Sequence, residues 1–360
     1  MELYFLDSQF AAVSPPVDTA TSVVWSERLD ECGTFAVELP LTMGAYAAAY
    51  TSRALVDLAN GAAYLCDRRF CGRIETVICR EHTLHIGGRL LECLLYDRVA
   101  SADTVYSGTL EQVIRAAIED WAGELPLTMP PALPLGTDAV QVTMERGERL
   151  GKWLTGLLAP MGAGYTITLT NEGTLTFGVY VGVDRSLDGA DGVSRAIFSE
   201  EFGNVAGLET ELYREDVWDR LYVEGSDGTM VVVDLSTVVD ATTVDAQTVW
   251  RREGYVKATD IRPGQFTTTA LYQAALRKRG TELLHKHRAL QRLTCIGEYA
   301  ATPEYGVDYR LGDICEVQSD TLGVRCALRL TAVDVVYEGG TVKLYPYFGG
   351  TVDRLRTVLW

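Results

Sequence analysis

Histidine is scarce in this sequence, which leaves few side chains for metal binding or proton transfer. Only four histidines occur among the 360 residues. His82 and His85 lie three residues apart in a predicted strand, so their side chains point to opposite faces. His285 and His287 lie two residues apart in a predicted helix, about 200° around its axis. Neither pair is therefore expected to share a metal ion.

The usual motifs of enzyme chemistry are also missing. The sequence contains no G-x-S-x-G elbow, no G-x-G-x-x-G fingerprint and no G-x-x-x-x-G-K-[ST] loop, so acyl-transfer and nucleotide sites lack their backbone frame. Asp184, Asp188 and Asp191 surround two glycines, but their spacing does not match a calcium loop and favours a solvated turn. Paired carboxylates for glycoside hydrolysis need no sequence proximity, so the 49 acidic residues neither indicate nor exclude such a pair. We expect no enzyme activity, no cofactor and no metal.

Long hydrophobic runs are absent as well. The N-terminus has no cationic stretch before its first acidic residues, unlike a secretory signal. The uncharged stretch at residues 39–52 is too short to span a bilayer and contains Pro40 and Gly44. We therefore expect a protein that is made and folded in a cytoplasm, without a membrane anchor.

The eight cysteines do not form a recognisable framework. Most stand inside apolar runs, which favours small buried hydrophobic residues over disulfides in a cytoplasmic chain. Cys66, Cys71 and Cys79 have the wrong spacing for a zinc knuckle. We predict that they are core thiols.

Positive charge is in deficit, and the charge is unevenly distributed. The formal net charge is −17, whereas proteins that grip DNA are normally basic. Residues 171–260 contain 18 acidic and 7 basic side chains, while residues 277–292 contain six Lys or Arg and a single acid. This asymmetry indicates either pairing between segments or subunits, or two separate solvated faces.

The sequence does contain patterns typical of β-strands, and the first group of them lies in residues 1–98. Extended runs at 21–29 and 34–39 are joined by a turn at which Gly33 is expected to take a positive φ. Residues 54–58 and 63–66, separated by an Asn-Gly pair, read as a hairpin. We interpret this region as a first β domain closed by a short helix at 90–96.

A small α+β module is predicted for residues 99–183. A capping-box pattern opens a helix at about 109–123, and the same apolar spacing recurs at about 148–162. A proline-rich loop separates the two helices. A hairpin over 165–181 completes the module.

Strands resume over residues 184–347, which we predict to be a second β domain. One helix, at about 267–289, interrupts them, and residues 348–360 form a C-terminal tail. The fold class is therefore mainly β with an α+β insert.

Several stretches resemble the hub proteins of phage and prophage tail tips, a family of siphovirus-type tail proteins. The resemblance covers most of the chain, in segments 23–25, 32–35, 39–40, 178–204, 221–225, 251–256 and 309–314. Within them the family-pattern positions are Trp25, Gly33, Pro40, Asp184, Arg185, Ser199, Asn204, Arg252, Glu253, Gly312 and Asp313.

The resemblance implies two tube-like β-barrel or sandwich domains flanking the α+β module. It implies a structural protein of the virion tail tip, assembled in the host cytoplasm. Three copies would form a ring at the distal end of the tail tube. Its partners would be the distal tail or tube protein, the tape-measure protein and a downstream fibre or receptor-binding protein. DNA would pass through without specific binding, because acidic side chains facing the passage would repel it. Residues 184–245 contain the densest set of such acids.

Two alternatives stay open at this stage. Six tryptophans and eighteen tyrosines are enough to supply the stacking surfaces of a receptor- or carbohydrate-binding tail protein. A β-rich cell-wall hydrolase is the third hypothesis. Trimer formation favours the hub, glycan binding favours the second reading, and turnover of cell-wall polymer favours the third.

Overall fold

The computed structural model describes residues 1–43, 50–80, 82–213, 215–237, 251–287, 290–298 and 302–351. The chain forms two compact units. The first combines Met1–Ala196, Ile296–Ile314 and Leu330–Pro346, and the second combines Ile197–Cys295, Cys315–Arg329 and Tyr347–Trp360. Each unit is thus assembled from segments far apart in the sequence.

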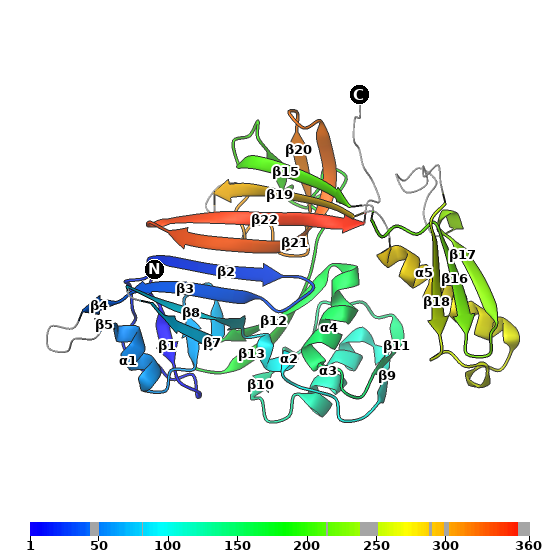
Figure 1. Cartoon of the computed structure of the whole chain (residues 1–360), viewed down its shortest axis with the longest axis horizontal. Coiled ribbons are helices and arrows are strands. Elements are labelled where there is room, and N and C mark those ends of the chain that lie inside the picture. Colours follow the sequence, from blue (N-terminus) through cyan, green and yellow to red (C-terminus); the bar gives the residue numbers. More distant parts are fainter. Residues whose placement is uncertain are drawn as a thin grey trace. The chain divides into compact units, whose positions relative to one another are not determined.

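The first unit contains an antiparallel sheet whose strands follow the order β1-β6-β7-β8-β3-β2-β21 (Figure 1). Its strands are β1 Tyr4–Leu6, β2 Ser22–Arg28, β3 Thr34–Pro40, β6 Tyr64–Cys66, β7 Cys71–Cys79, β8 Thr83–Leu90 and β21 Val324–Glu338. Two short strands, β4 Thr42–Met43 and β5 Tyr50–Thr51, pair with each other in a separate sheet. In β3, Phe35, Val37 and Leu39 are buried in alternation, as expected for a strand with one buried face, and the extended run predicted at 34–39 is confirmed.

The predicted strand over 54–58 is wrong, because these residues belong to helix α1, Arg53–Ala59. Ser52 caps the helix by accepting a hydrogen bond from the second helical N–H. The Asn60-Gly61 pair ends it, with Gly61 at a φ of 96°. An Asn-Gly pair suits a hairpin turn and a helix C-terminus equally well, and the Ala-Leu composition of the segment favours helix.

The α+β module follows within the first unit. Its elements are α2 Cys93–Tyr96, β9 Thr104–Thr109, α3 Leu110–Trp121, β10 Leu127–Thr128, β11 Ala139–Met144, α4 Leu150–Leu158, the 3-10 turn η1 Ala159–Met161, β12 Ala163–Leu169 and β13 Leu175–Val181. Helices α3 and α4 and the β12–β13 hairpin share one hydrophobic core, in which Ile114, Leu154 and Phe177 are fully buried. Both predicted helices and the hairpin are confirmed, whereas the β9–β11 pair was not expected.

The capping box at the start of α3 makes a local prediction. The Thr109 side chain accepts a hydrogen bond from the Gln112 N–H at 3.3 Å, and the Gln112 side chain accepts one from the Thr109 N–H at 2.9 Å. We expect Thr109→Ala to lower the free energy of unfolding by about 1 kcal/mol. Thr109→Ser, which keeps the hydroxyl, is the control in the same urea titration, and equal losses in both variants would contradict the cap.

The second unit contains a three-stranded sheet, β17-β16-β18, covered on one face by helix α5. Tyr272, Leu276 and Leu284 of α5 are buried against Val223 and Val233 of this sheet. The other strands of the unit come from residues 197–213, 290–295, 315–329 and 347–351. The elements of this unit are β14 Ile197–Ser199, β15 Val205–Tyr213, β16 Arg220–Gly225, β17 Met230–Asp234, the 3-10 turn η2 Leu235–Thr237, β18 Glu253–Ala258, the 3-10 turn η4 Pro263–Gln265 and α5 Thr269–Lys286. The residues of β19 Leu290–Glu298, β20 Ile314–Ser319, β21 and β22 Thr341–Thr351 are divided between the two units.

The fold is mainly β with an α+β insert, as predicted. Among the described residues no sheet closes on itself, so the tube-like form of the two β regions stays a prediction, as do the domain limits at 98 and 183. Part of the acid-rich range 184–245, the end of the 267–289 helix and most of the 348–360 tail lie outside the described residues.

The expectation of core thiols fails at three cysteines. Cys66 and Cys71 face each other in the β6–β7 hairpin and form a disulfide, and Cys79 is exposed. Spacing alone did not reveal the disulfide because it depends on the tight turn between the two strands. The buried thiols at Cys93, Cys295, Cys315 and Cys326 agree with the prediction.

Candidate functional site

The family-pattern residues near 185 and 313 meet in the first unit, although about 130 residues separate them. The Arg185 Nε lies 2.6 Å from Asp313 Oδ2. The side chain of Asp313 is completely buried and that of Arg185 is 11% exposed. The same carboxylate accepts hydrogen bonds from the backbone N–H of Val183 at 2.7 Å and of Arg310 at 3.1 Å. Asp313 therefore joins three positions of the chain through one buried charge.

Arg185 is held at its other end as well. Its guanidinium donates to the Ser194 hydroxyl at 2.6 Å. The backbone runs alongside the 313 segment, because Arg185 N donates to Ile314 O and Ile314 N donates to Val183 O. We call residues 182–186 together with 312–314 the motif junction.

Two glycines let the backbones of the motif junction touch. Gly312 has a φ of 90°, and a Cβ there would lie 2.5 Å from the Gly162 carbonyl oxygen. A Cβ on Gly182 would overlap the Gly312 carbonyl. Gly182 N also donates to Gly162 O at 2.9 Å, so the end of the α+β module is fixed to this junction.

Ser199, the last residue of β14, and Asn204 stabilise a turn in the second unit. The Asn204 side chain accepts from the Ser199 N–H at 2.9 Å and donates to Ile197 O at 2.8 Å. The Ser199 hydroxyl accepts from the Glu201 N–H at 3.2 Å. These bonds satisfy backbone groups that the turn leaves unpaired.

The pair at the start of β18 is also structural. Arg252 contributes its backbone, since its N–H donates to Asp219 Oδ2 at 2.7 Å and its carbonyl accepts from the Asp219 N–H at 2.8 Å. Glu253 forms an ion pair with Arg251 and accepts from the Tyr222 hydroxyl at 3.2 Å. The pair therefore sets the register of β18 beside β16.

The three N-terminal family-pattern residues lie in β2 and around β3. Trp25 is buried and stacks on Phe70, with ring centroids 5.3 Å apart. Pro40 ends β3. Gly33 does not have the expected positive φ. It is needed for close packing, because a Cβ there would lie 2.5 Å from a Leu90 methyl group.

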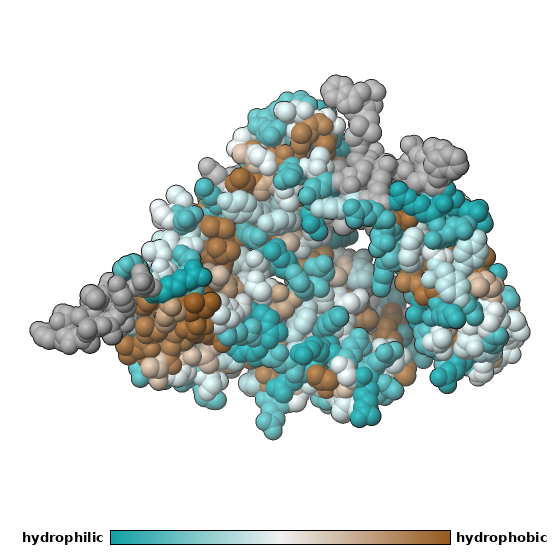
Figure 2. All heavy atoms as spheres, viewed as in Figure 1, coloured by the Kyte–Doolittle hydropathy of each residue, from teal (hydrophilic) through white to brown (hydrophobic). Residues whose placement is uncertain are grey.

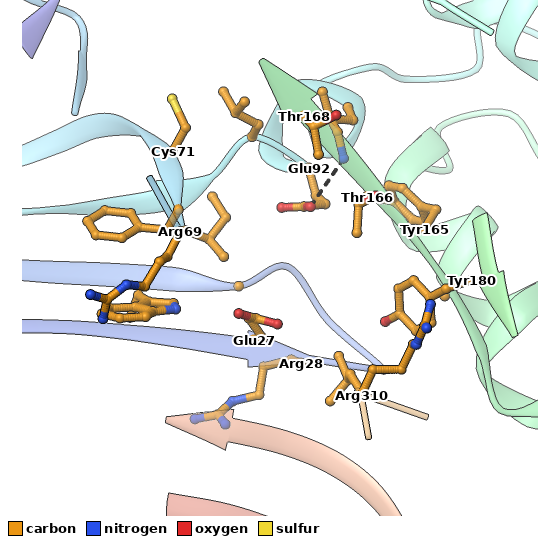
Figure 3. Close-up of a pocket in the computed structure, with 18 of the residues that line it drawn as sticks. Glu27, Arg28, Arg69, Cys71, Glu92, Tyr165, Thr166, Thr168, Tyr180 and Arg310 are labelled. Atoms are coloured by element: carbon orange, nitrogen blue, oxygen red, sulfur yellow. Dashed lines mark hydrogen bonds between the residues drawn. The ribbon is translucent and has the colours of Figure 1, made fainter. Parts of the chain in front are cut away.

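A cavity of about 630 Å³ lies in the first unit (Figure 3), and no sequence pattern predicted it. It is bordered by β2, the turn before β7, the start of α2, the β12–β13 hairpin and the 305–311 segment. Its polar lining includes Glu27, Glu92, Tyr165, Tyr180 and Tyr305. These residues come from four segments that are distant in the sequence, so only the folded chain brings them together.

Among the carboxyl groups that line this cavity, those of Glu27 and Glu92 have a pKa that burial raises. The Glu27 carboxylate accepts from the Tyr305 hydroxyl at 2.6 Å. Glu92 Oε1 accepts from the Ile167 N–H at 3.3 Å. Burial, reinforced by the negative charge of Glu27, raises the pKa of Glu92 to about 7. Burial also raises the pKa of Tyr180. A cavity with these groups is suited to bind a polar ligand.

The residues weighed for metals are spread apart. His85 lies 3.1 Å from Glu38, and His287 stacks on Trp218. Asp184 accepts from the Ser186 N–H and hydroxyl. Within the described ranges, no group of three His, Cys, Asp or Glu is placed to hold a metal ion. No helix in those ranges is long and apolar enough to cross a membrane.

Solved structures of tail proteins share this fold. The tail protein from Neisseria meningitidis superimposes with a TM-score of 0.61 at 13% identity, covering 97% of this chain and 96% of that one. The 43 kDa tail protein of prophage MuSo2 from Shewanella oneidensis superimposes with a TM-score of 0.59 at 13% identity, and the match covers 97% of this chain and 98% of that one. Prophage tail protein gp18 from Listeria monocytogenes superimposes with a TM-score of 0.53 at 10% identity, and the match covers 96% of this chain and 94% of that one.

Among proteins with curated functions, none matches the sequence. The family model of the Siphovirus ReqiPepy6 Gp37-like proteins matches residues 2–350, nearly the whole chain. That match confirms the resemblance found in the sequence. The chain therefore belongs to the Siphovirus ReqiPepy6 Gp37-like family of tail proteins.

Proposed function

We propose that this chain is the hub of a phage tail tip, a homotrimeric ring at the distal end of the tail tube through which DNA passes. The supporting observation is that its fold matches tail proteins over nearly their whole length. In this proposal residues 1–98 and 184–347 supply the tube-like parts of each subunit. The distal tail protein, the tape-measure protein and a fibre or receptor-binding protein are the neighbours, and no bond is made or broken.

The surface is consistent with a protein that contacts others. Figure 2 shows hydrophilic residues over much of the face in view, and hydrophobic residues gathered over α1. Val56 of α1 is 49% exposed. Exposed apolar patches on soluble proteins are typical of contact surfaces.

The ring is tested by the mass and shape of the purified protein. We expect light scattering to give a species of about three times 39.5 kDa that grows with concentration, as a weak closed assembly should. Negative-stain images of that species should show a central opening. Monomers alone at every concentration, or trimers without an opening, would contradict the ring.

The net charge of −17 gives the ring an electrostatic role. A wall of carboxylates repels DNA, so the polyanion does not pause while passing through. Asp191, Glu209 and Glu215 are exposed acids in the acid-rich range. We propose that residues of this range face the passage.

Reversing these three charges tests the acidic passage. We expect a phage carrying Asp191→Lys, Glu209→Lys and Glu215→Lys to assemble normally and to deliver DNA several-fold more slowly at low salt, with partial recovery at high salt. The control reverses three exposed acids outside the range, Asp18, Glu119 and Asp138, and changes the net charge equally. Equal delivery rates for both variants, measured by potassium release or DNA ejection, would argue against an acidic passage at these positions.

A further inference from the structure

None of the residues that line the cavity of the first unit belongs to the motif junction, and the proposed ring does not depend on the cavity. Its volume of about 630 Å³ lies within the usual range of small-ligand sites, roughly 300–1,000 Å³. Figure 3 shows the carboxyl groups of Glu27 and Glu92 reaching into it from opposite sides.

Glu92 is the unusual group of this cavity. Its Oε1 accepts one backbone hydrogen bond, but its Oε2 is buried and has no hydrogen-bond partner among the described residues. A buried carboxylate oxygen without a partner is costly. The neighbouring charge that acts on it, Glu27, has the same sign. Among the described residues, the charge that acts on the Glu92 carboxyl group is therefore a like charge, and no cationic side chain offsets it.

The arginine side chains along the lining either contact other side chains or are exposed to solvent. Arg28 lies 2.7 Å from Asp334, and Arg69 lies over the Trp25 ring at 5.8 Å. Arg310 is exposed. A cation supplied from outside would meet both carboxylates, and two adjacent carboxylates favour a cation over a neutral hydroxyl group.

The rest of the lining suits the carbon chain of such a cation. Leu29, Leu91 and Ile167 offer apolar contact to an alkyl stem. The rings of Tyr165 and Tyr180 border the same space (Figure 3) and can bind an ammonium group through their faces.

We propose that this cavity binds an alkylammonium group between the carboxylates of Glu27 and Glu92. The group is either the side chain of a lysine on another tail protein or a free diamine of similar length. Both sources share a primary ammonium head that donates to Glu92 Oε2 and an apolar stem.

Binding should depend on pH through Glu92. In the unliganded protein the pKa of Glu92 is about 7, so the carboxylate is increasingly protonated, and unable to pair with a cation, as the pH falls below that value. We expect affinity at about pH 6 to be roughly tenfold weaker than at about pH 8. The other titratable or charged groups that face Glu92 or line the cavity are Glu27, Arg28, Glu31, Cys32, Asp67, Arg68, Arg69, Tyr96, Tyr165, Tyr180, Tyr305 and Arg310.

Isothermal titration of the full chain with two probes tests the proposal. The probes are cadaverine and a short peptide containing one lysine, and their neutral counterparts are pentanediol and the acetyl-lysine peptide. We expect at least one cationic probe to bind and both neutral counterparts to fail. Binding of the peptide alone identifies a protein lysine as the source, and binding of cadaverine alone identifies a free diamine.

Variants locate the binding in the cavity. Glu92→Gln keeps the shape of the side chain and should weaken cation binding at least tenfold while abolishing its pH dependence. Glu31→Gln, an exposed glutamate of the same lining, should change affinity less than twofold. Circular dichroism and thermal unfolding establish that both variants fold. Absence of binding by both cations, unchanged affinity in Glu92→Gln, or preferential binding of chitin oligosaccharides would overturn the proposal.

Discussion

Replacing Asp313 by alanine is expected to lower the free energy of unfolding of the first unit by about 3–5 kcal/mol. The substitution removes a completely buried carboxylate. It leaves the Arg185 guanidinium without its main partner and leaves the N–H groups of Val183 and Arg310 unpaired. Urea titration monitored by tryptophan fluorescence measures the loss.

Two further variants separate charge from hydrogen bonding at the motif junction. Asp313→Asn retains an acceptor oxygen and should lose less than Asp313→Ala. Arg185→Ala should lose a similar amount to Asp313→Ala, and the double variant should lose much less than the sum, because each single change leaves a buried charge behind.

An exposed ion pair provides the matched control. Arg325 and Asp320 lie 3.3 Å apart with side chains 57% and 60% exposed. Arg325→Ala should therefore cost less than about 1 kcal/mol. A loss for Asp313→Ala as small as this would show that the motif junction does not hold the first unit together.

Gly182→Ala is expected to have the second largest effect, a loss of about 3 kcal/mol or more. The added methyl group would overlap the Gly312 carbonyl oxygen and lie 2.9 Å from that of Gly162. Both obstacles are backbone atoms, so neither can move away without shifting a strand or a helix end. The soluble yield and the urea midpoint report the loss.

The same substitution elsewhere should have the opposite sign. Gly156 lies inside α4, and a Cβ there would meet nothing within 4 Å. Gly156→Ala should therefore stabilise the protein by about 0.5–1 kcal/mol, because alanine is the better helix former. If both variants lost stability alike, crowding at Gly182 would not be the cause.

Sequence patterns predicted best the elements whose signals are local. The helices beginning at Leu110 and Leu150 are specified by apolar spacing, and the first also by its capping box. Helix α1 was missed because an Asn-Gly pair serves two structures. Strand β15 carries mostly small and charged residues and was not recognised as a strand.

The candidate site was predictable only in part. Both partners of the Arg185–Asp313 pair stood out by resemblance, but nothing in the sequence indicated that they touch. No sequence pattern indicated the cavity, because burial raises the pKa of Glu27, and burial together with the charge of Glu27 raises that of Glu92. Contacts between distant segments produce chemistry that no local pattern encodes.

The first sheet requires residues from far along the chain. Strand β2, near the N-terminus, pairs with β21 more than 300 positions later, and Arg185 meets its partner 128 residues downstream. During synthesis the ribosome must therefore deliver most of the polypeptide before this unit can close. Until β21 has been synthesised, one edge of β2 has no partner strand, and Arg185 lacks the carboxylate of Asp313 as its counter-ion. Refolding should accordingly be slow, and nascent chains should be open to chaperones for most of their translation.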